Sequence, residues 1–324
     1  MSKPYVYVTR KLPEHTLTKL ADIAEIGMWD SEDTAVPRDV LIKEARRADG
    51  LLVMLSDKLD DEILRSPSLK IAANLAVGYD NMDTAAAERH GVVITNTPDV
   101  LTDTTADLVF ALILSSARRV VEAAQYVKNG DWKSWSPLLL AGADVHRKTI
   151  GIFGMGRIGE AVARRAKGFD MNVLYHNRTR KEITETLVGV RYAALDELLQ
   201  HSDFVVNLAP LTKETTKMFG KEVFLKMKKS AFFINGGRGG SVDEDALLHA
   251  LQQKEIAGAG LDVYEVEPID PNHPLLTMKN VTALPHIGSS TIETRCAMAR
   301  LAAENIALVL TGKAAKTPIL LRSE

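Results

Sequence analysis

The sequence predicts an α/β fold with parallel sheets, divided between two domains. Short runs rich in β-branched and aromatic residues alternate with longer helix-forming stretches, which is typical of βαβ units. The chain has 324 residues, more than one hydrophobic core usually holds, so two domains are expected. A second strand–helix series begins near Lys148, after a long connecting stretch, and this places the second domain.

In the first half, Tyr5–Thr9 reads as a strand, Leu17–Ile26 as a helix and Gly50–Leu55 as the next strand. The runs 70–76 and 91–96 continue the alternation. From Thr102 to about Asn129 the sequence favours one long helix, of the kind that carries a chain from one domain into another.

In the second half, strand-like runs recur at 149–153, 172–176, 203–210, 231–236, 257–264 and 280–286. The last helical stretch, 293–313, is amphipathic. By its pattern alone it can either close the second domain or cross back to the first.

Composition argues against several classes of protein. The net charge of −2 gives no overall basic field for nucleic acid or an anionic membrane. The single cysteine, Cys296, permits no internal disulfide. We find no signal-peptide pattern, no apolar run long enough to span a bilayer, no zinc-ligand spacing and no G-x-S-x-G motif, and we therefore expect a cytoplasmic protein without a metal site.

A glycine-rich turn opens the second series. Gly154, Gly156 and Gly159 in GMGRIG match G-x-G-x-x-G, with a strand-like run before it and a helix-like run after it. In that context the pattern predicts a dinucleotide site. Gly154 permits a tight turn, Gly156 permits close approach of a pyrophosphate, and Gly159 permits tight packing of the helix on the strand. N–H groups at the helix start bind the phosphates. The intervening residues Met155, Arg157 and Ile158 belong to the same predicted site.

A basic stretch, LYHNRTRKE, lies at residues 174–182, where the next strand ends. NAD-selective sites often have Asp or Glu here, which binds the ribose 2′-hydroxyl and repels a 2′-phosphate. Asn177 removes that repulsion, Arg178 can bind a phosphate through two hydrogen bonds, and Thr179 and Arg180 can add donors. We predict a preference for NADPH; the alternative is a solvated basic loop that accepts NADH as well.

Three downstream side chains suit the reduction of a carbonyl group. Arg238, Glu267 and His286 lie at or near the C-terminal ends of predicted parallel strands, where ligands bind in open α/β sheets. His286 can protonate the carbonyl oxygen, and Glu267 can orient the ring and favour the imidazolium form. Arg238 can bind a carboxylate and polarise the adjacent carbonyl.

The motifs GMGRIG, NGGRG, GLDVYEVEP and PHIGSST, in this order, resemble the D-isomer-specific 2-hydroxyacid dehydrogenases, and the resemblance runs along nearly the whole chain. LLVMLSD, AVGYDNMD, TPDVLTDTTAD and KNGDWKSW resemble especially the glyoxylate/hydroxypyruvate reductases and bacterial 2-ketogluconate reductases. The resemblance implies two Rossmann- or flavodoxin-like, doubly wound parallel-sheet domains. Residues 1–101 and 288–324 would form a discontinuous substrate-binding domain, and residues 102–287 an NAD(P)-binding domain with the dimerisation segment, so that the last helix crosses back.

The resemblance also implies roles for individual residues. Arg238, Glu267 and His286 match the family's catalytic set. Leu55, the backbone amides of Val77 and Gly78, and Ser289 beside His286 would lie next to the substrate. Pro210, Gly236 and Asp262 would lie next to the nicotinamide of the cofactor. A homodimer formed through the NAD(P)-binding domains is also implied, and Trp135 is a hypothetical contact to the partner's substrate site.

The turn around Arg238 differs from the family's pattern. Gly237 stands where relatives often have Ala or Ser, and Gly240 follows closely, so we expect more backbone freedom near Arg238. Ser241 and Glu244 match a capping box for the helix that follows.

The function these features favour is NADPH-dependent reduction of small 2-keto acids, such as glyoxylate, hydroxypyruvate or 2-ketogluconate, to D-2-hydroxy acids. Two alternatives stay open: an NAD-dependent D-2-hydroxyacid dehydrogenase for another substrate, and a nucleotide-sensing protein that resembles the corepressors with this fold. The motifs leave the preferred 2-keto acid undecided.

Overall fold

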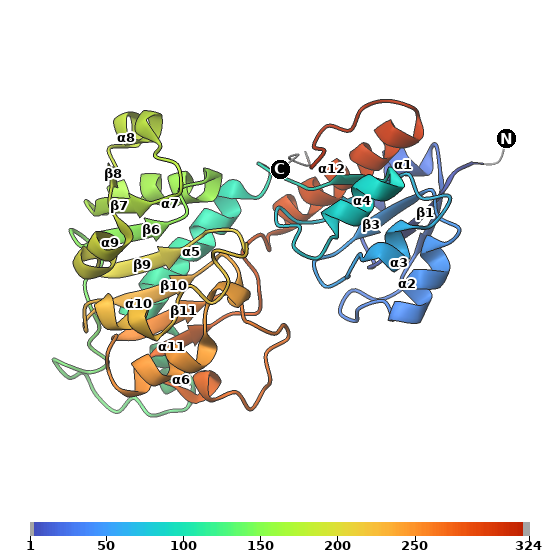
Figure 1. The fold of residues 1–324 in the computed structure, drawn as a ribbon. Coiled ribbons are helices and arrows are strands. Elements are labelled where there is room, and N and C mark those ends of the chain that lie inside the picture. The colour runs from blue at the N-terminus through green and yellow to red at the C-terminus, as the bar shows by residue number, and fades with distance from the viewer. Residues whose placement is uncertain (1–2, 320–324) are drawn as a thin grey trace. The chain divides into compact units, whose positions relative to one another are not determined.

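The structure, a computed structural model, describes residues 3–319 (Figure 1). Its internal contacts divide the chain into two compact units. The first contains the chain up to Leu101 and from Ser290 onward, and the second contains Thr102–Ser289. The return to the first unit therefore lies two residues beyond the expected point between 287 and 288.

The first unit has a five-stranded parallel sheet in the order β2-β1-β3-β4-β5. Its strands are β1 Tyr5–Val8, β2 Glu25–Met28, β3 Gly50–Val53, β4 Ile71–Asn74 and β5 Val93–Thr95. Its helices are η1 Glu14–Thr16, α1 Thr18–Ala21, α2 Arg38–Ala45, α3 Asp61–Leu64, α4 Thr84–His90 and α12 Ile292–Leu310. The last helix packs against β3 and β4, so the C-terminal stretch does cross back.

The helix expected at Leu17–Ile26 is wrong. α1 has only four residues, and β2 begins at Glu25 and pairs with β1. Pairing at the edge of the sheet overrides the local helical pattern. A Cβ at Gly27 would lie 2.0 Å from the hydroxyl oxygen of Tyr5, so a larger residue at this place in β2 would displace the Tyr5 side chain.

The second unit has a seven-stranded parallel sheet in the order β12-β11-β10-β9-β6-β7-β8. The strands are β6 Thr149–Phe153, β7 Asn172–His176, β8 Arg191–Tyr192, β9 Phe204–Asn207, β10 Phe232–Asn235, β11 Gly258–Leu261 and β12 Val281–Ala283. The helices are α5 Thr102–Ala117, α6 Val120–Lys128, α7 Arg157–Lys167, α8 Glu182–Val188, α9 Leu195–His201, α10 Lys221–Lys226, η2 Gly239–Ser241, α11 Glu244–Gln252 and η3 Pro274–Thr277.

Both faces of this sheet are buried, as expected of a doubly wound fold. Ile150 and Ile152 of β6 pack into one core with α5 and α7, whereas Phe153 packs into the opposite core with α9, α10 and α11. Because these strands are parallel, the carboxyl ends of β6, β9, β10, β11 and β12 lie along one edge of the sheet, and the predicted residues Gly154, Pro210, Arg238, Glu267 and His286 follow them.

The single helix expected over 102–129 is wrong as well. α5 ends at Ala117, and Arg119 adopts a left-handed conformation (φ 53°) before α6 begins. The Ala117 carbonyl accepts a hydrogen bond from the N–H of Ala143 (2.8 Å). A Cβ at Gly142 would lie 2.1 Å from the same oxygen, so this returning segment occupies the space where the helix would continue.

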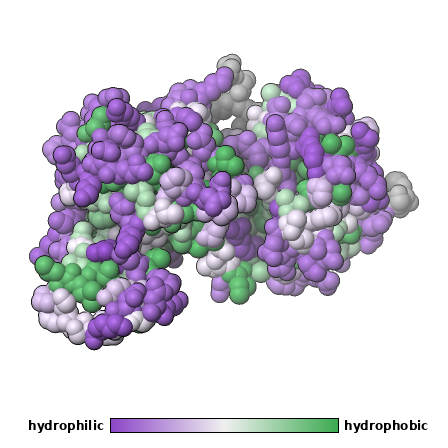
Figure 2. Space-filling view, turned by 90° about the horizontal axis from the view of Figure 1, so that it is seen from below, coloured by the Kyte–Doolittle hydropathy of each residue, from purple (hydrophilic) through white to green (hydrophobic). Residues whose placement is uncertain are grey.

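On the face drawn in Figure 2, hydrophilic residues predominate and hydrophobic residues are exposed in separate groups. Within residues 3–319, no helix combines the length and the apolar character that a bilayer span requires.

Candidate active site

The glycine loop joins β6 to α7 in the form a dinucleotide requires. Gly154 has φ 102°, and a Cβ there would lie 2.6 Å from the Ala209 nitrogen. A Cβ at Gly159 would lie 2.4 Å from the Gly154 oxygen. Gly156, in contrast, has open space beside it and precedes the first turn of α7. Two glycines therefore allow the turn to close, and the third leaves room for a pyrophosphate at the helix N-terminus, so these residues fit NAD(P).

The two arginines of the basic loop after β7 differ in their interactions. Arg180 forms a two-pronged ion pair with Glu185, with both N–O distances 2.8 Å. This ion pair, together with the hydroxyl of Tyr175, holds the pKa of Glu185 at about 2. Arg178 is exposed and makes no hydrogen bond or ion pair with any residue in 3–319. Asn177 donates to the carbonyl of Thr179 (3.0 Å). Arg178 is therefore the arginine available to a ligand.

His286 and Glu267 form a hydrogen-bonded pair in the second unit. Nδ1 of His286 lies 2.6 Å from Oε2 of Glu267, and Oε1 of Glu267 accepts from the N–H of Tyr264 (3.1 Å). Because a carboxylate only accepts, Nδ1 carries a proton. Within the described chain Nε2 of His286 has no hydrogen-bond partner, so this atom can exchange a proton with a ligand.

Asp262 fixes the turn that carries His286. Its two carboxylate oxygens accept from the N–H groups of Ile287 (2.7 Å) and Gly288 (2.8 Å). Burial raises the pKa of the Asp262 carboxyl. His286 itself has φ 53°, an uncommon conformation for a non-glycine residue, and the two hydrogen bonds stabilise it.

Arg238 lies in the turn after β10, and a buried polar network holds its backbone. Its carbonyl accepts from Oγ of Ser241 (2.6 Å) and Nδ2 of Asn235 (3.2 Å). Nδ2 of Asn207 donates to both Asn235 (3.0 Å) and Ser241 (2.7 Å). The sequence interpretation missed these three positioning residues. Their signal was a polar side chain at the end of a buried strand, in Asn207 and Asn235.

The capping box predicted for α11 is wrong. The N-cap is Asp243, whose carboxylate accepts from the N–H of Ala246 (3.1 Å). Ser241 binds the Arg238 backbone instead, and Glu244 accepts from the N–H of Glu265 (2.8 Å). Both side chains of the expected box therefore bind the backbone near Arg238 and Glu267 rather than the start of the helix.

The added glycine before Arg238 is closely packed. A Cβ at Gly237 would lie 3.0 Å from the carbonyl oxygen of Ala209, and the Gly237 N–H donates to Asn235 (3.2 Å). Gly239 is more restricted, because its Cβ would lie 1.8 Å from the carbonyl carbon of Tyr264. A side chain at either position would therefore need local movement of its neighbours, and the backbone freedom expected at this turn stays a prediction.

The predicted substrate-side residues of the first unit lie in two loops that Asn81 joins. Leu55 is half-buried in the turn after β3, where Nδ2 of Asn81 donates to the carbonyls of Met54 (3.1 Å) and Asp57 (3.0 Å). Val77 and Gly78 are half-buried in the loop after β4. That loop also contains Asn81.

The remaining predicted residues lie in the second unit. Trp135 is 78% exposed in the segment after α6. Ser289 is half-buried three residues beyond His286, and Gly236 follows β10. Pro210 is exposed and its carbonyl accepts from Oγ1 of Thr215 (2.8 Å).

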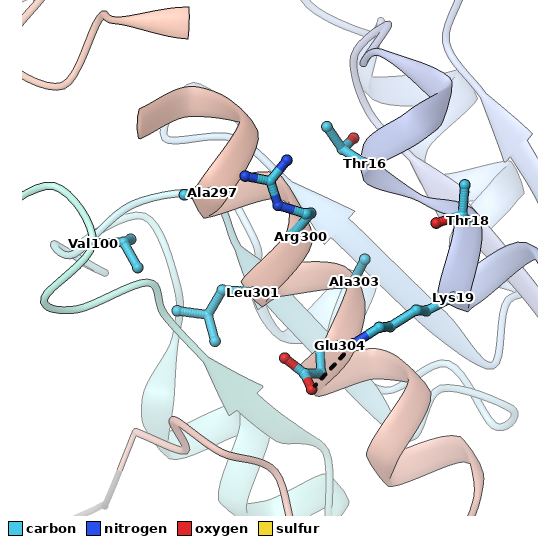
Figure 3. Close-up of a pocket in the computed structure, with 9 residues that line it drawn as sticks. All are labelled: Thr16, Thr18, Lys19, Val100, Ala297, Arg300, Leu301, Ala303 and Glu304. Atoms are coloured by element: carbon cyan, nitrogen blue, oxygen red, sulfur yellow. Dashed lines mark ion pairs between the residues drawn. The ribbon is translucent and has the colours of Figure 1, made fainter. Parts of the chain in front are cut away.

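A cavity of about 390 Å³ lies elsewhere in the first unit, between α12 and the η1–α1 segment (Figure 3). None of its lining residues belongs to the predicted site. Glu304 lies 4.0 Å from Nζ of Lys19 and 2.8 Å from Nζ of Lys316, so its charge is offset by those lysines. Over residues 3–319, no cluster of three His, Cys, Asp or Glu side chains has a metal-binding arrangement.

Comparison with known proteins extends this picture. Residues 110–288, more than half of the chain, match the family model for the NAD-binding domain of D-isomer-specific 2-hydroxyacid dehydrogenases. The glyoxylate reductase of Korarchaeum cryptofilum is 49% identical over 307 residues, covering 94% of this chain and 92% of that protein. The glyoxylate reductase of Thermococcus kodakarensis is 47% identical, covering 97% and 96%. The chain belongs to the D-isomer-specific 2-hydroxyacid dehydrogenase family.

Solved structures of similar proteins agree with the fold. A protein of Thermus thermophilus superposes with a TM-score of 0.91 at 42% identity, covering 98% of this chain and all of that chain. The NADPH-dependent glyoxylate/hydroxypyruvate reductase of Sinorhizobium meliloti, solved with NADP and malonate, has a TM-score of 0.84 at 36% identity, covering 98% and 97%. This 2-hydroxyacid dehydrogenase thus has the two Rossmann-like parallel-sheet domains expected from its sequence.

Proposed function

We propose that this family member reduces small 2-keto acids, glyoxylate first among them, to 2-hydroxy acids of the D series with NADPH. The observation that carries the proposal is the His286–Glu267 pair, with Nδ1 on the carboxylate and Nε2 left for a substrate. The relatives named as glyoxylate reductases support the choice of substrate.

In this mechanism each protein group has a separate task. The chemistry that the bound cofactor supplies is hydride donation to the carbonyl carbon. The protonated Nε2 of His286 gives its proton to the carbonyl oxygen, and Glu267 holds the ring at Nδ1 while the charge changes. Arg238 binds the substrate carboxylate and polarises the carbonyl next to it. The backbone amides of Val77 and Gly78 bind the same carboxylate.

The cofactor residues follow from the glycine loop and the basic loop. Gly154 and Gly159 close the turn, Gly156 leaves room for the pyrophosphate at the start of α7, and Arg178 binds the 2′-phosphate of NADPH. Pro210, Gly236 and Asp262 line the nicotinamide side. The NADP bound in the Sinorhizobium meliloti enzyme supports this choice over NADH.

Among substrates, glyoxylate and hydroxypyruvate are supported by the names of relatives. For 2-ketogluconate the support is the motif resemblance alone. We expect kcat/KM to be higher for one of the two smaller acids than for the six-carbon acid.

The first experiment measures oxidation of NADPH and of NADH with glyoxylate, hydroxypyruvate and 2-ketogluconate. His286→Ala should lower kcat by about 10²- to 10⁴-fold, the range for loss of a general acid, while NADPH still binds. His90→Ala is the matched control, because it removes an imidazole that pairs with Asp61 (2.9 Å) in the other unit. A wild type that binds NADPH and reduces none of the three acids would contradict the proposal and favour nucleotide sensing.

A further inference from the structure

Three consecutive carbonyl groups of the loop after β4 are hydrogen-bonded. Ala76 accepts from the N–H of Thr97, Val77 from Nδ2 of Asn96, and Gly78 from Nδ2 of Asn74, each at 2.8 Å. The N–H groups of Val77 and Gly78 donate to no other group in residues 3–319. The loop thus has its acceptors occupied and two donors open.

The hydrogen bonds to these carbonyls also determine which way the N–H groups of Val77 and Gly78 point. In a trans peptide the C=O and the N–H point to opposite sides of the chain. Thr97 binds the C=O of the peptide whose N–H belongs to Val77, and Asn96 binds the C=O of the peptide whose N–H belongs to Gly78. Both N–H groups therefore point away from the segment after β5, and hydrogen bonds to their carbonyls strengthen them as donors.

Asn96 is itself held at both backbone groups. Its carbonyl accepts from Oγ1 of Thr317 (2.7 Å), and its N–H donates to the carbonyl of Thr317 (3.3 Å). Thr317 is bound in turn by Asn305 of α12, a fully buried residue. Nδ2 of Asn305 donates to Oγ1 of Thr317 (2.8 Å), and its Oδ1 accepts from the N–H groups of Lys316 (2.8 Å) and Thr317 (3.1 Å).

We propose that Asn96 is a positioning residue for the substrate carboxylate: it holds the Val77–Gly78 peptide so that the Gly78 N–H faces the ligand, and Thr317 and Asn305 hold Asn96. The inference rests on the proposed function, because the ligand is the carboxylate of a 2-keto acid. Asn96 touches neither substrate nor cofactor in this scheme. Two open N–H groups on a fixed loop form a site for an anion of this kind.

The test separates substrate binding from chemistry and from folding. In Asn96→Ala the KM for glyoxylate should rise about 10-fold with kcat within about 3-fold of wild type, because the lost interaction is the same in the ground and transition states. In the NADPH-loaded protein the Kd of oxamate, an unreactive mimic of the 2-keto acid, should rise by about the same factor. The Kd of NADPH should stay unchanged. Asn96→Asp keeps the side-chain size but has no N–H donor, and should raise the KM at least as far.

Two further variants complete the design. Thr317→Val removes the hydroxyl that holds Asn96, and should raise the KM by about 2- to 3-fold, since the backbone hydrogen bond remains. Thr16→Val is the control in the same unit: it removes the bond from Oγ1 of Thr16 to the Pro13 carbonyl (2.7 Å) and should keep the wild-type KM.

The outcomes distinguish this inference from the proposed function. If the wild type reduces glyoxylate and Asn96→Ala lowers only the Tm, with KM and the Kd of oxamate unchanged, Asn96 is structural and the inference is wrong. If neither Asn96 variant folds, an unchanged KM and Kd in Thr317→Val overturns it. A wild type that neither binds oxamate nor reduces a 2-keto acid removes the proposed function, and the inference with it.

Discussion

Asp262 is 3% exposed, and the turn that carries His286 uses both of its carboxylate oxygens. In Asp262→Ala the N–H groups of Ile287 and Gly288 lose their acceptors, and each unpaired buried group costs about 1–3 kcal/mol. We expect a lower free energy of unfolding and a kcat reduced by at least about 10-fold, because His286 is no longer held at its left-handed φ.

Asp262→Asn provides the internal comparison, because its single amide oxygen can still accept one of the two hydrogen bonds. Its kcat should fall between those of the wild type and Asp262→Ala. Urea unfolding and steady-state kinetics on the three proteins check the order. An Asp262→Ala protein that loses stability but keeps its kcat would show that the turn does not position His286.

The two arginines of the basic loop differ in their partners, and replacing each one should therefore change the KM for NADPH to a different extent. Arg178 makes no hydrogen bond or ion pair in the described chain, whereas Arg180 is bound by Glu185. Arg178→Ala should raise the KM for NADPH by about 10- to 150-fold, since hydrogen bonds to charged groups contribute about 1.5–3 kcal/mol. The KM for NADH should stay as in the wild type, and Arg180→Ala should change either value less.

Arg191→Ala is the matched control for these variants, because Arg191 is a surface arginine of the same unit that pairs with Glu197 (2.6 Å). Kinetics with both cofactors decide between the two interpretations of the loop. If Arg178→Ala raises the KM for NADPH and the KM for NADH by the same factor, the loop is a general basic surface and does not recognise the 2′-phosphate.

The helices, strands and turns that the sequence predicted correctly are those encoded by neighbouring residues. The strand runs, the glycine turn and the positions of Arg238, Glu267 and His286 near strand ends all come from short stretches. The end of α5 at Ala117 does not, because Ala143, 26 residues further on, occupies the last carbonyl. Such a contact leaves no periodic signal near the place where it acts.

The positioning residues were missed for the same reason. Asn96 joins Val77 to Thr317, which is 221 residues away along the chain from Asn96, through side-chain and backbone hydrogen bonds. Ser241 looked like a helix cap because its spacing to Glu244 fits one, yet the Arg238 carbonyl is its partner. Spacing predicts which residues are able to form a motif; tertiary structure decides which partner each one takes.

The turn after β3 contains a buried carboxylate that should make the first unit sensitive to pH. Asp57 is 3% exposed and accepts from the N–H of Met54 (2.8 Å) and the hydroxyl of Thr9. Burial raises the pKa of Asp57 above its ordinary value of 3.8. Between the ordinary and the raised pKa, the folded chain keeps a proton that the unfolded chain has lost.

The contribution of Asp57 to stability is therefore complete below pH 3.8 and is lost as the pH rises through the raised pKa. Asp57→Asn does not titrate, so the stability difference between wild type and variant should shrink as the pH rises through this window. Urea unfolding from pH 4 to pH 7 measures it. A difference that stays constant, or that grows with pH, would contradict a raised pKa at Asp57.

One stretch of the second unit exposes many large apolar side chains. They are Val120, Val121, Val127, Trp132, Trp135, Leu138 and Leu139, with exposed fractions from 37% to 81%. Val120 and Val127 are seven residues apart and so share one face of α6. Apolar groups gathered on one segment mark an interaction surface. We propose that a second copy of the chain covers it and that the protein is a homodimer.

Light scattering should then give twice the mass of one chain for the wild type. Val127→Asp should shift the mass toward the monomer, because it places an unpaired charge in the buried interface. Ile183→Asp is the control: Ile183 is 77% exposed on α8 of the same unit, outside the apolar stretch, and its variant should remain dimeric. A wild type with the mass of one chain would contradict the proposal.

Trp135→Ala tests whether Trp135 contributes to dimer assembly, to substrate binding, or to both. The side chain is 78% exposed within the chain, so its loss should scarcely change the stability of the monomer fold. If it reaches the partner's substrate site, the dimer stays intact and the KM for the larger 2-keto acids changes. Unchanged kinetics with an intact dimer would assign Trp135 to interface packing alone, whereas loss of the dimer would make it an anchor of the interface, as a large buried aromatic residue often is.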